Sequence, residues 1–166
     1  MSRKITMPNL EDMKFVVGEE IEISGDIFCG RDAVLPQIVQ LHKKGLLEKC
    51  GIDLRGGVIF HTAVSKAGIG PTSSNKLEIE SSIPALSEAG IKLHLGKGAL
   101  KPETVEALAK HGSYFAVTPP ITAFFENAIV SKEVVAFPEF GVEAFYRVRV
   151  KDFPAIIAVA NGDSIF

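Results

Sequence analysis

Short apolar segments alternate with helical patterns along the whole chain, and this alternation limits the possible folds more than any other feature. Strand-like segments are found at residues 21–24, 57–60, 91–95, 114–117, 134–137, 145–150 and 155–160. Segments with helix signals are found at residues 32–46, 82–89 and 102–111. Strands that alternate with helices predict an α/β fold whose sheet is largely parallel or mixed.

The expected helix boundaries coincide with residues that have known terminal preferences. Asp32 suits the N-cap of the first helix, and Pro36 is tolerated only near its first turn. Gly90 closes the second helix. Pro102 and Gly112 stand at the start and just past the end of the third, the placement that proline and glycine favour. We therefore expect three helices, each followed by a strand.

The composition is that of an ordinary globular domain. The 166 residues are 46% hydrophobic and 23% charged, with a formal net charge of −2. This balance, without a basic run, predicts neither a nucleic-acid nor an anionic-membrane partner. Without repeats or linkers, residues 1–166 should form one domain, with residues 1–14 as a polar arm. The chain shows no bilayer-length apolar run and no signal-peptide core, so we expect a cytoplasmic protein.

The cysteines and histidines do not form a metal-binding pattern. Cys29 and Cys50 are too few for a disulfide framework or for an iron–sulfur cluster, which takes three or four thiolates. No spacing of histidine and cysteine is typical of zinc sites. His61 and His94 end apolar strands, so each could approach a cleft, whereas the other two histidines are expected near helix ends at the surface. The expectation is that this chain holds no metal of its own.

Three glycine-rich segments carry cationic or hydroxyl side chains at positions expected for loops between strands and helices. They are residues 24–32, 68–76 and 96–98. In open α/β sheets, ligands bind at the carboxyl ends of strands, where such loops gather. The backbone N–H groups at the start of a following helix also attract anions. The three segments therefore predict a cleft that binds an anion.

Three cations, Arg31, Lys76 and Lys97, would face that cleft and would suit a ligand with two carboxylates or phosphates. Each segment also has a simpler interpretation. Arg31 and Asp32 can be an ion pair at a helix start, and the Gly-Lys-Gly around Lys97 can be an ordinary turn. The hydroxyls of residues 72–74 can be helix caps. Nucleotide-binding patterns do not occur, so the residues alone indicate an anion-binding α/β domain of open chemistry.

Taken in order, the motifs of this chain resemble the β region of the class I, iron–sulfur fumarase and tartrate dehydratase family. The matching blocks are SGDIFCGRD (24–32), GPTSSNKLE (70–78), GKG (96–98), GVEAF (141–145) and VKDFPA (150–155). The likeness covers roughly residues 15–166. It implies a fold similar to the swivelling β/β/α domains, with a mixed sheet.

The resemblance also implies which residues form the site. Arg31, Thr72 and Lys97 match substrate-contacting or catalytic positions of the family. Thr72 would transfer a proton, and Arg31 would clamp a carboxylate with its planar fork. Lys76 and Ser73 match further substrate-binding positions, where the family usually has arginine and threonine. Because lysine lacks the bidentate fork of arginine, the preferred diacid stays open.

The implied activity is that of a β subunit of an iron–sulfur hydro-lyase, with fumarate hydration to L-malate expected first. The 4Fe–4S cluster would be held by a partner α subunit, in an α2β2 assembly, and would act as a Lewis acid. L-Tartrate dehydration is the alternative activity within the family. A non-enzymatic anion-binding or regulatory domain of the same fold is a second alternative. A stand-alone serine or threonine hydrolase is a third, and no local signature favours it.

Overall fold

The structure is a computed structural model that describes residues 3–7, 13–31, 33–65, 68–72, 76–96, 100–118 and 129–165. For residues 63–65, 68–72 and 76–79 it describes the backbone alone. Within these ranges, no helix is both long enough and apolar enough to cross a membrane.

Strands and helices alternate along the chain, which confirms the predicted mixed α/β class. The strands are β1 (Arg3–Thr6), β2 (Glu20–Gly30), β3 (Val58–Ser65), β4 (Gly68–Thr72), β5 (Leu93–Gly96), β6 (Tyr114–Val117), β7 (Ile129–Ala136), β8 (Phe145–Ala160) and β9 (Asp163–Ser164). The α-helices are α1 (Leu35–Lys43), α2 (Lys76–Glu88) and α3 (Pro102–His111), with 3-10 turns η1 (Glu48–Cys50) and η2 (Pro138–Glu143).

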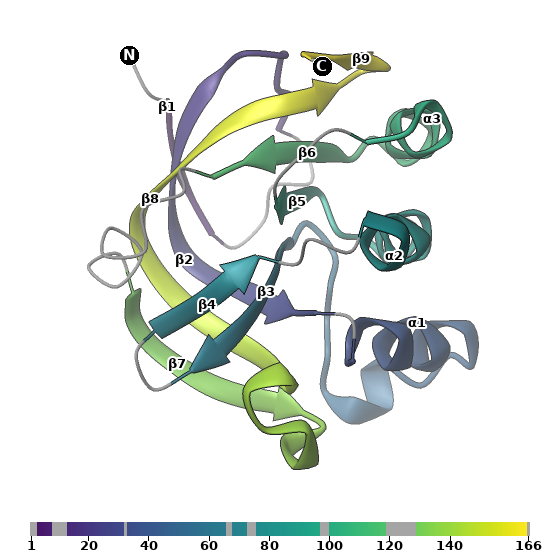
Figure 1. The fold of residues 1–166 in the computed structure, drawn as a ribbon, viewed down its shortest axis with the longest axis vertical. Coiled ribbons are helices and arrows are strands. Elements are labelled where there is room, and N and C mark those ends of the chain that lie inside the picture. Colours follow the sequence, from purple (N-terminus) through teal and green to yellow (C-terminus); the bar gives the residue numbers. More distant parts are fainter. Residues whose placement is uncertain are drawn as a thin grey trace.

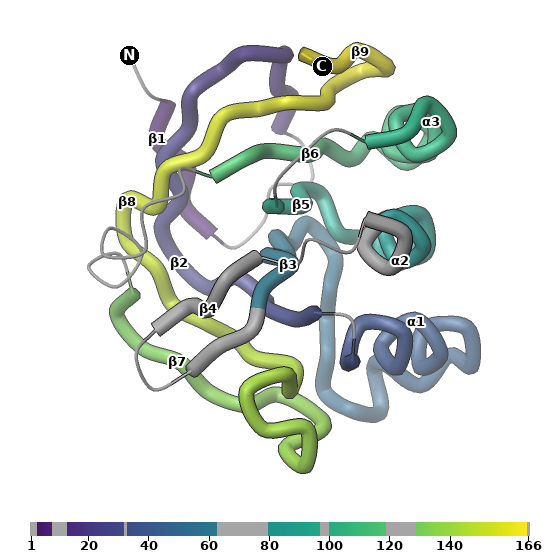
Figure 2. Tube along the Cα trace, viewed as in Figure 1, coloured from purple at the N-terminus to yellow at the C-terminus, as the bar shows by residue number. Residues whose placement is uncertain are grey.

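Five of the strands close into a ring. β2, β3, β5 and β6 pair in parallel, in that order. The long strand β8 then pairs antiparallel with both β6 and β2, which joins the two ends of the row. Figure 2 traces β2 and β8 side by side along the curved side of the molecule. β1 pairs with β2, β4 with β3, and β7 and β9 with β8, outside the ring.

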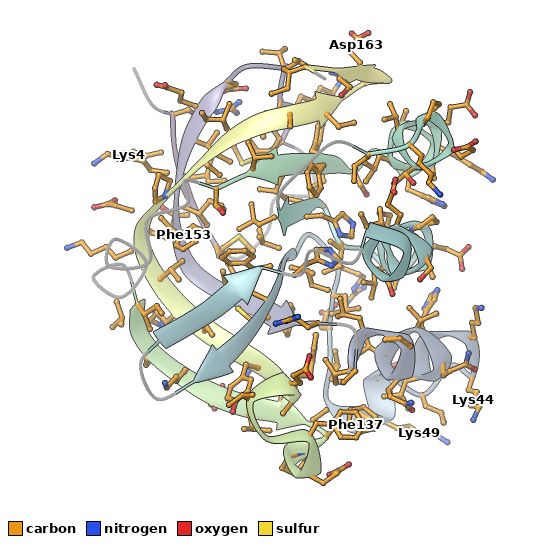
Figure 3. The ribbon with its side chains drawn as sticks, viewed as in Figure 1. Lys4, Lys44, Lys49, Phe137, Phe153 and Asp163 are labelled. Atoms are coloured by element: carbon orange, nitrogen blue, oxygen red, sulfur yellow. The ribbon has the colours of Figure 1, made fainter. Side chains whose placement is uncertain are left out.

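Apolar side chains pack on both faces of the curved sheet. A core cluster inside the ring includes Ile21, Phe60, Leu95 and Phe153, all buried. Figure 3 shows Phe153 among the strands, whereas Lys4 and Asp163 point outward. The helices α1, α2 and α3 lie in a row on the outer face of the sheet (Figure 1), where two further clusters fill the space beneath them. The sheet therefore has a buried inner face and a helix-covered outer face.

The first helix is shorter than predicted. It was expected to run over residues 32–46, but α1 spans Leu35–Lys43, with Val34 as its N-cap. The chain leaves the helix at Gly45, whose φ of +69° is left-handed, and the N–H of Leu46 then bonds the carbonyl of Leu41. The prediction overlooked this glycine C-terminal stop. Asp32, the predicted N-cap, lies outside the described residues.

The second helix is longer than predicted, because α2 begins at Lys76 rather than at residue 82. Pro84 lies inside α2. The segment 68–76, expected as a loop, also contains the strand β4. The third helix and the strand over residues 114–117 were predicted correctly, as α3 and β6.

Two predicted strand ends are bends within continuous strands. β2 was expected to stop at Gly25, yet it continues to Gly30 through an irregularity at Gly25, which has φ +113°. A Cβ at Gly25 would lie 2.6 Å from Cβ of Met7, so this position needs glycine. On the partner strand, β8 runs unbroken through Asp152, with φ +50°, where two separate strands were expected.

The polar arm predicted for residues 1–14 contains an element of regular structure. Its residues Arg3–Thr6 form β1, which pairs in parallel with residues 21–24 of β2. Ile5 is buried in the ring cluster, so one apolar residue in a polar segment is enough to tie β1 to the sheet. The described part of the arm belongs to the domain.

Candidate functional site

The strand register brings several predicted positions to one edge of the sheet. Gly30, the last residue of β2, pairs with His61 of β3. Thr62, the next residue of β3, pairs with Thr72, the last residue of β4. β5 runs beside β3 in parallel and ends at Gly96. The carboxyl ends of β2 and β5 and the end of β4 therefore meet at the same edge, beside the N-terminal ends of α1 and α2 (Figure 1).

The start of α1 at this edge is electropositive. The N-terminal N–H groups of an α-helix have no partner within the helix and carry a partial positive charge. At α1, the carbonyl of Arg31 accepts the N–H groups of Val34 and Leu35, which fixes the turn between β2 and the helix. The first turn of α1 contains no acidic side chain that would neutralise the charge. An anion is therefore favoured here.

Arg31 supplies a fixed positive charge at the same edge. Its side chain is 27% exposed, and its Nε lies 3.7 Å from Oε1 of Glu143 in η2. That distance is too long for a hydrogen bond. Nε is buried and has no hydrogen-bond partner within the described part of the chain. Glu143 thus holds the guanidinium loosely in place and leaves donors available to an anion.

The other predicted site residues are placed only in part. The structure puts the backbones of Thr72 and Lys76 at this edge, at the end of β4 and the start of α2. It gives no side-chain positions for either residue. Ser73 and Lys97 lie outside the described residues. The structure thus groups Arg31, Thr72 and Lys76 by backbone position, and contact between these side chains and a ligand stays a prediction.

A buried chain of polar side chains lies directly beneath this edge. His61 Nε2 lies 3.2 Å from His94 Nδ1, and His94 Nε2 lies 2.9 Å from the hydroxyl of Ser87 on α2. All three side chains are buried. The sequence indicated that each histidine could approach a cleft, but the bonded pair and the role of Ser87 were missed. Two histidines at central positions of otherwise apolar strands are the signal that could have revealed it.

Both histidines are neutral near neutral pH. Burial lowers the pKa of His61 from its ordinary 6.5 to about 4. Burial, and then the charge of His61 nearby, hold the pKa of His94 well below its usual range. The pair therefore contributes hydrogen bonds to this region and no charge.

A buried carboxylate supports the neighbouring helix start. One oxygen of Glu80 on α2 accepts the backbone N–H of Lys101 at 2.6 Å and the hydroxyl of Thr104 at 2.9 Å. Thr104 lies in the first turn of α3, and Lys101 is the N-cap of this helix. Glu80 therefore ties α2 to the chain just after the Gly-Lys-Gly segment. No sequence pattern predicted this contact, because it depends on the packing of α2 against α3.

The cysteines of this chain do not fit a metal cluster. Cys29 is buried in β2 inside the ring, and burial raises the pKa of its thiol far above the usual range. Cys50 is exposed on η1. Across the residues that the structure describes, no three histidine, cysteine or acidic side chains are grouped as metal ligands would be. A thiol that is difficult to ionise is also a poor metal ligand.

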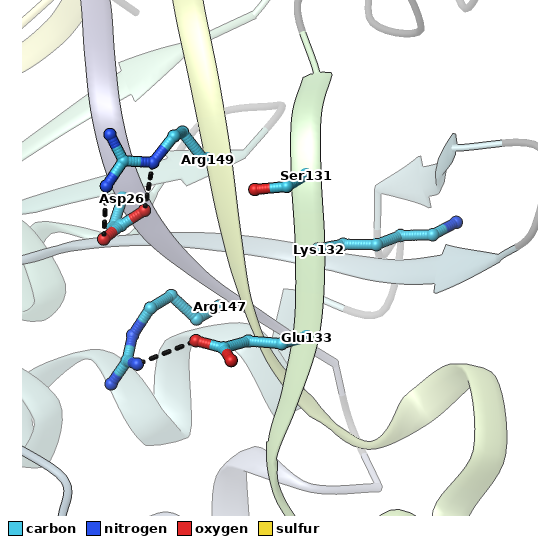
Figure 4. Close-up of a pocket in the computed structure, with 6 residues that line it drawn as sticks. All are labelled: Asp26, Ser131, Lys132, Glu133, Arg147 and Arg149. Carbon is cyan, nitrogen blue, oxygen red and sulfur yellow. Dashed lines mark hydrogen bonds and ion pairs between the residues drawn. The ribbon is translucent and has the colours of Figure 1, made fainter.

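A second polar pocket lies on the far strands and has a different character (Figure 4). It has a volume of about 270 Å³ and is lined by residues of β2, β7 and β8. Arg149 pairs with Asp26 at 3.3 Å, and Arg147 pairs with Glu133 at 2.9 Å. Each arginine already has an acidic partner, so this pocket offers an anion much less than the edge at Arg31.

The fold is an α/β domain in which the carboxyl ends of β2 and β5 meet the N-terminal ends of α1 and α2 at one edge. A family model described as fumarase C-terminus matches residues 2–166. The chain therefore belongs to the fumarase C-terminus family.

Named relatives agree with the family. A protein of Geobacillus stearothermophilus, provisionally named a class I fumarate hydratase, is 29% identical over 97% of this chain. The anaerobic class I fumarate hydratase of Escherichia coli is 26% identical over 92% of it. The chain spans about a third of the length of these relatives, 32% and 29%. The L(+)-tartrate dehydratase subunit beta of Escherichia coli is 29% identical, and here the chain spans 83% of the relative.

Proposed function

We propose that this chain is the β part of a hydro-lyase that acts on a small dicarboxylate, with fumarate and L-malate as the favoured pair. The observation that carries the proposal is the edge at which the backbones of Arg31, Thr72 and Lys76 meet beside two helix N-termini. A dicarboxylate needs two cationic ends, and this edge is electropositive. The names of the relatives support a hydratase or dehydratase reaction.

Each residue has a distinct part in the proposed reaction. In the dehydration of malate, a C–H bond next to one carboxylate loses its proton, and the hydroxyl leaves as water. Arg31 holds a carboxylate by a charge-assisted pair of hydrogen bonds. Lys97 and Lys76 stabilise the negative charge that grows on the neighbouring carboxylate as the proton leaves. Ser73 binds substrate beside Thr72, which carries the proton and becomes basic enough only when cations lie close to its hydroxyl.

The proposed reaction also needs a 4Fe–4S cluster, which would supply Lewis acidity to the leaving hydroxyl. The cysteines of this chain do not fit its ligands, since Cys29 is shielded inside the ring and Cys50 lies apart on η1. We therefore assign the cluster to a partner α subunit. A partner is supported by the name of the tartrate dehydratase relative, a β subunit. Val130 and Val134 of β7 are exposed apolar residues, and a partner can cover them.

L-Tartrate dehydration is the second candidate activity. Two observations favour it. The tartrate dehydratase subunit beta is 29% identical over 96% of this chain, the same identity as the class I fumarate hydratase relative of Geobacillus stearothermophilus. Lys76 also replaces the arginine expected from the family pattern, and a lysine holds a carboxylate less directionally than an arginine. The two candidate activities use the same site, and their substrates differ only in the groups between the two carboxylates.

Reconstitution tests the proposal. The chain alone should not hydrate fumarate. Mixed under anaerobic conditions with a cluster-bearing α subunit, the chain should hydrate fumarate or dehydrate L-tartrate, and the comparison of kcat/KM identifies the preferred diacid. A chain that hydrates fumarate alone without iron would contradict the proposal. So would an assembled, cluster-loaded complex that turns over neither diacid.

A further inference from the structure

The buried chain from Ser87 through His94 to His61 ends in an unused nitrogen. His61 Nδ1 is buried and has no hydrogen-bond partner among the residues that the structure describes. An unsatisfied buried polar group is costly, and native proteins keep few of them. His61 is fixed by its bond to His94, so its ring cannot turn to find another partner without breaking that bond. This nitrogen is therefore placed for an acceptor that arrives from elsewhere.

The hydrogen-bonded side chains from Ser87 to His61 lead toward the candidate site. Ile59 pairs with His94 in the register of β3 and β5, so His61 lies two residues closer to the carboxyl edge than His94 does. Ile59 packs in the helix-side cluster and Phe60 in the ring cluster. Because side chains alternate along a strand, His61 faces the helix side, as Ile59 does. The bond from His61 to His94, and the bond from His94 to Ser87 of α2, require this orientation.

A second buried nitrogen without a hydrogen-bond partner among the described residues lies one residue past the end of the adjacent strand, β2. His61 pairs with Gly30, and Arg31 follows Gly30 directly. Arg31 Nε is also buried and lacks a hydrogen-bond partner in the described part of the chain. Two unused nitrogens on neighbouring strands, at the edge where two helices begin, favour one acceptor-rich ligand. Since Arg31 is always charged, that ligand is an anion.

The tautomer of the histidine pair follows from the ligand. A neutral imidazole has one N–H donor and one acceptor nitrogen. If an anion occupies the edge, the side-chain nitrogen that meets it, His61 Nδ1, must be a hydrogen-bond donor. The hydroxyl of Ser87 then donates to His94 Nε2, His94 Nδ1–H donates to His61 Nε2, and His61 carries its proton on Nδ1. Each member fixes the tautomer of the next.

We propose that Ser87 and His94 lock His61 as a neutral Nδ1–H donor on the floor of the site, where it binds a carboxylate oxygen of the dicarboxylate beside Arg31. The inference rests on the proposed function for the identity of the ligand. Away from bulk water, a neutral donor in a low-dielectric setting is directional and forms a strong hydrogen bond. His61 would thus help to select a ligand whose carboxylate reaches this depth.

Nitrogen-15 NMR on histidine-labelled full-length chain tests the tautomer. At pH 7, we expect His61 to carry its proton on Nδ1 and to keep it there when succinate, a dicarboxylate that cannot react, is added. Addition of succinate should shift the His61 Nδ1 signal. The surface residues His42 and His111 serve as internal references that should not follow the succinate titration. A proton on His61 Nε2, or a His61 signal unmoved at saturating succinate, would overturn the proposal.

Two matched substitutions separate the two ring nitrogens. The amide of His61→Asn places a donor near the position of Nδ1, whereas that of His61→Gln reaches the position of Nε2. Both variants lose half of the histidine contacts, so both should unfold at a lower temperature by similar amounts. In the assembled complex, His61→Gln should raise KM for the diacid about tenfold, the loss of one hydrogen bond to a charged group. His61→Asn should keep KM within about twofold of the wild type.

The outcomes separate this inference from the proposed function. If the complex turns over fumarate or tartrate and the two variants have equal KM values, the role of His61 is wrong and the proposed function stands. If the complex turns over no diacid but succinate still shifts His61 Nδ1, the donor role stands and the proposed function is wrong. Equal loss of kcat in both variants, with KM unchanged, would show a structural role alone and would overturn the inference.

Discussion

The edge at Arg31 and the pocket on β2, β7 and β8 both contain arginines, but they differ in how these charges are satisfied. In the pocket, Arg147 and Arg149 have carboxylate partners at 2.9 and 3.3 Å (Figure 4). At the edge, Glu143 lies 3.7 Å from Arg31 Nε, too far for a hydrogen bond, and neither this nitrogen nor His61 Nδ1 has a hydrogen-bond partner among the described residues. Arginines with close carboxylate partners form ion pairs at the protein surface. Buried donor nitrogens that lack a hydrogen-bond partner indicate where a ligand is expected.

The largest effect should come from Thr72, whose proposed role exists only in the transition state. Thr72→Val keeps the side-chain shape and removes the hydroxyl, so kcat should fall by about 10²–10⁴ while KM changes little. Steady-state kinetics on the assembled complex measures both constants. Thr72→Ser should restore much of the rate, and Thr6→Val, on exposed β1, should change neither constant. A near-normal kcat for Thr72→Val would show that the hydroxyl of Thr72 takes no part in the proton transfer.

The next effect concerns pH and the buried histidines. Because the pKa of His61 falls from 6.5 to about 4 on folding, the unfolded chain binds more protons between these values. Stability should therefore be complete above pH 6.5 and decline as the pH falls toward 4, by about 3 kcal/mol from His61 alone. Urea unfolding from pH 7 to 4 measures the slope. Loss of His61 in His61→Gln should flatten this slope, and equal slopes in both proteins would contradict the assignment.

A smaller effect should follow from the loss of the Arg31 charge. Arg31→Ala should raise KM for the diacid by about 10- to 100-fold and change kcat less, because the clamp acts in both the ground state and the transition state. Arg55→Ala is the matched control, since Arg55 is 74% exposed and pairs with Asp53 outside this edge. If Arg31→Ala and Arg55→Ala have the same KM, the edge at Arg31 is not an anion site.

The smallest effect should come from the paired pocket. Arg147→Ala breaks an ion pair whose glutamate, Glu133, is 62% exposed, so the free energy of unfolding should fall by less than about 1 kcal/mol. Its contact over the ring of Phe28, at 5.8 Å, adds little at a partly exposed site. Urea unfolding checks the stability, and KM for the diacid should not move. A KM change as large as that of Arg31→Ala would identify the pocket as a second anion site.

The sequence predicted best the features that depend on local signals. The α3 helix has a proline and a glycine at its two ends, and β6 is a short apolar run, so both were found with correct bounds. The rule that strand-to-helix loops gather at one edge of an α/β sheet grouped Arg31, Lys76 and Lys97, whereas Thr72 was added by the family resemblance. Features that depend on contact with a distant segment of the chain were missed.

The missed features depend on contacts between distant segments. Gly25 and Asp152 read as strand ends, yet each is a bend that the neighbouring strand stabilises: the N–H of Asp152 bonds the hydroxyl of Ser24. The link between His61 and His94 likewise depends on the register of β3 against β5. No pattern along one segment contains that register, so it became visible only in three dimensions.

The closure of the ring by β8 has a consequence for how the chain reaches its native state. Asp26 and Arg149 pair across strands although they are 123 positions apart in the sequence. Such distant pairings pay the entropy of a long loop before they gain any contact, and proteins rich in them fold slowly. β8 also joins four other strands, β2, β6, β7 and β9. During synthesis, the chain must therefore remain open until residues 145–160 have left the ribosome, with the apolar interior of the future ring exposed to chaperones until then.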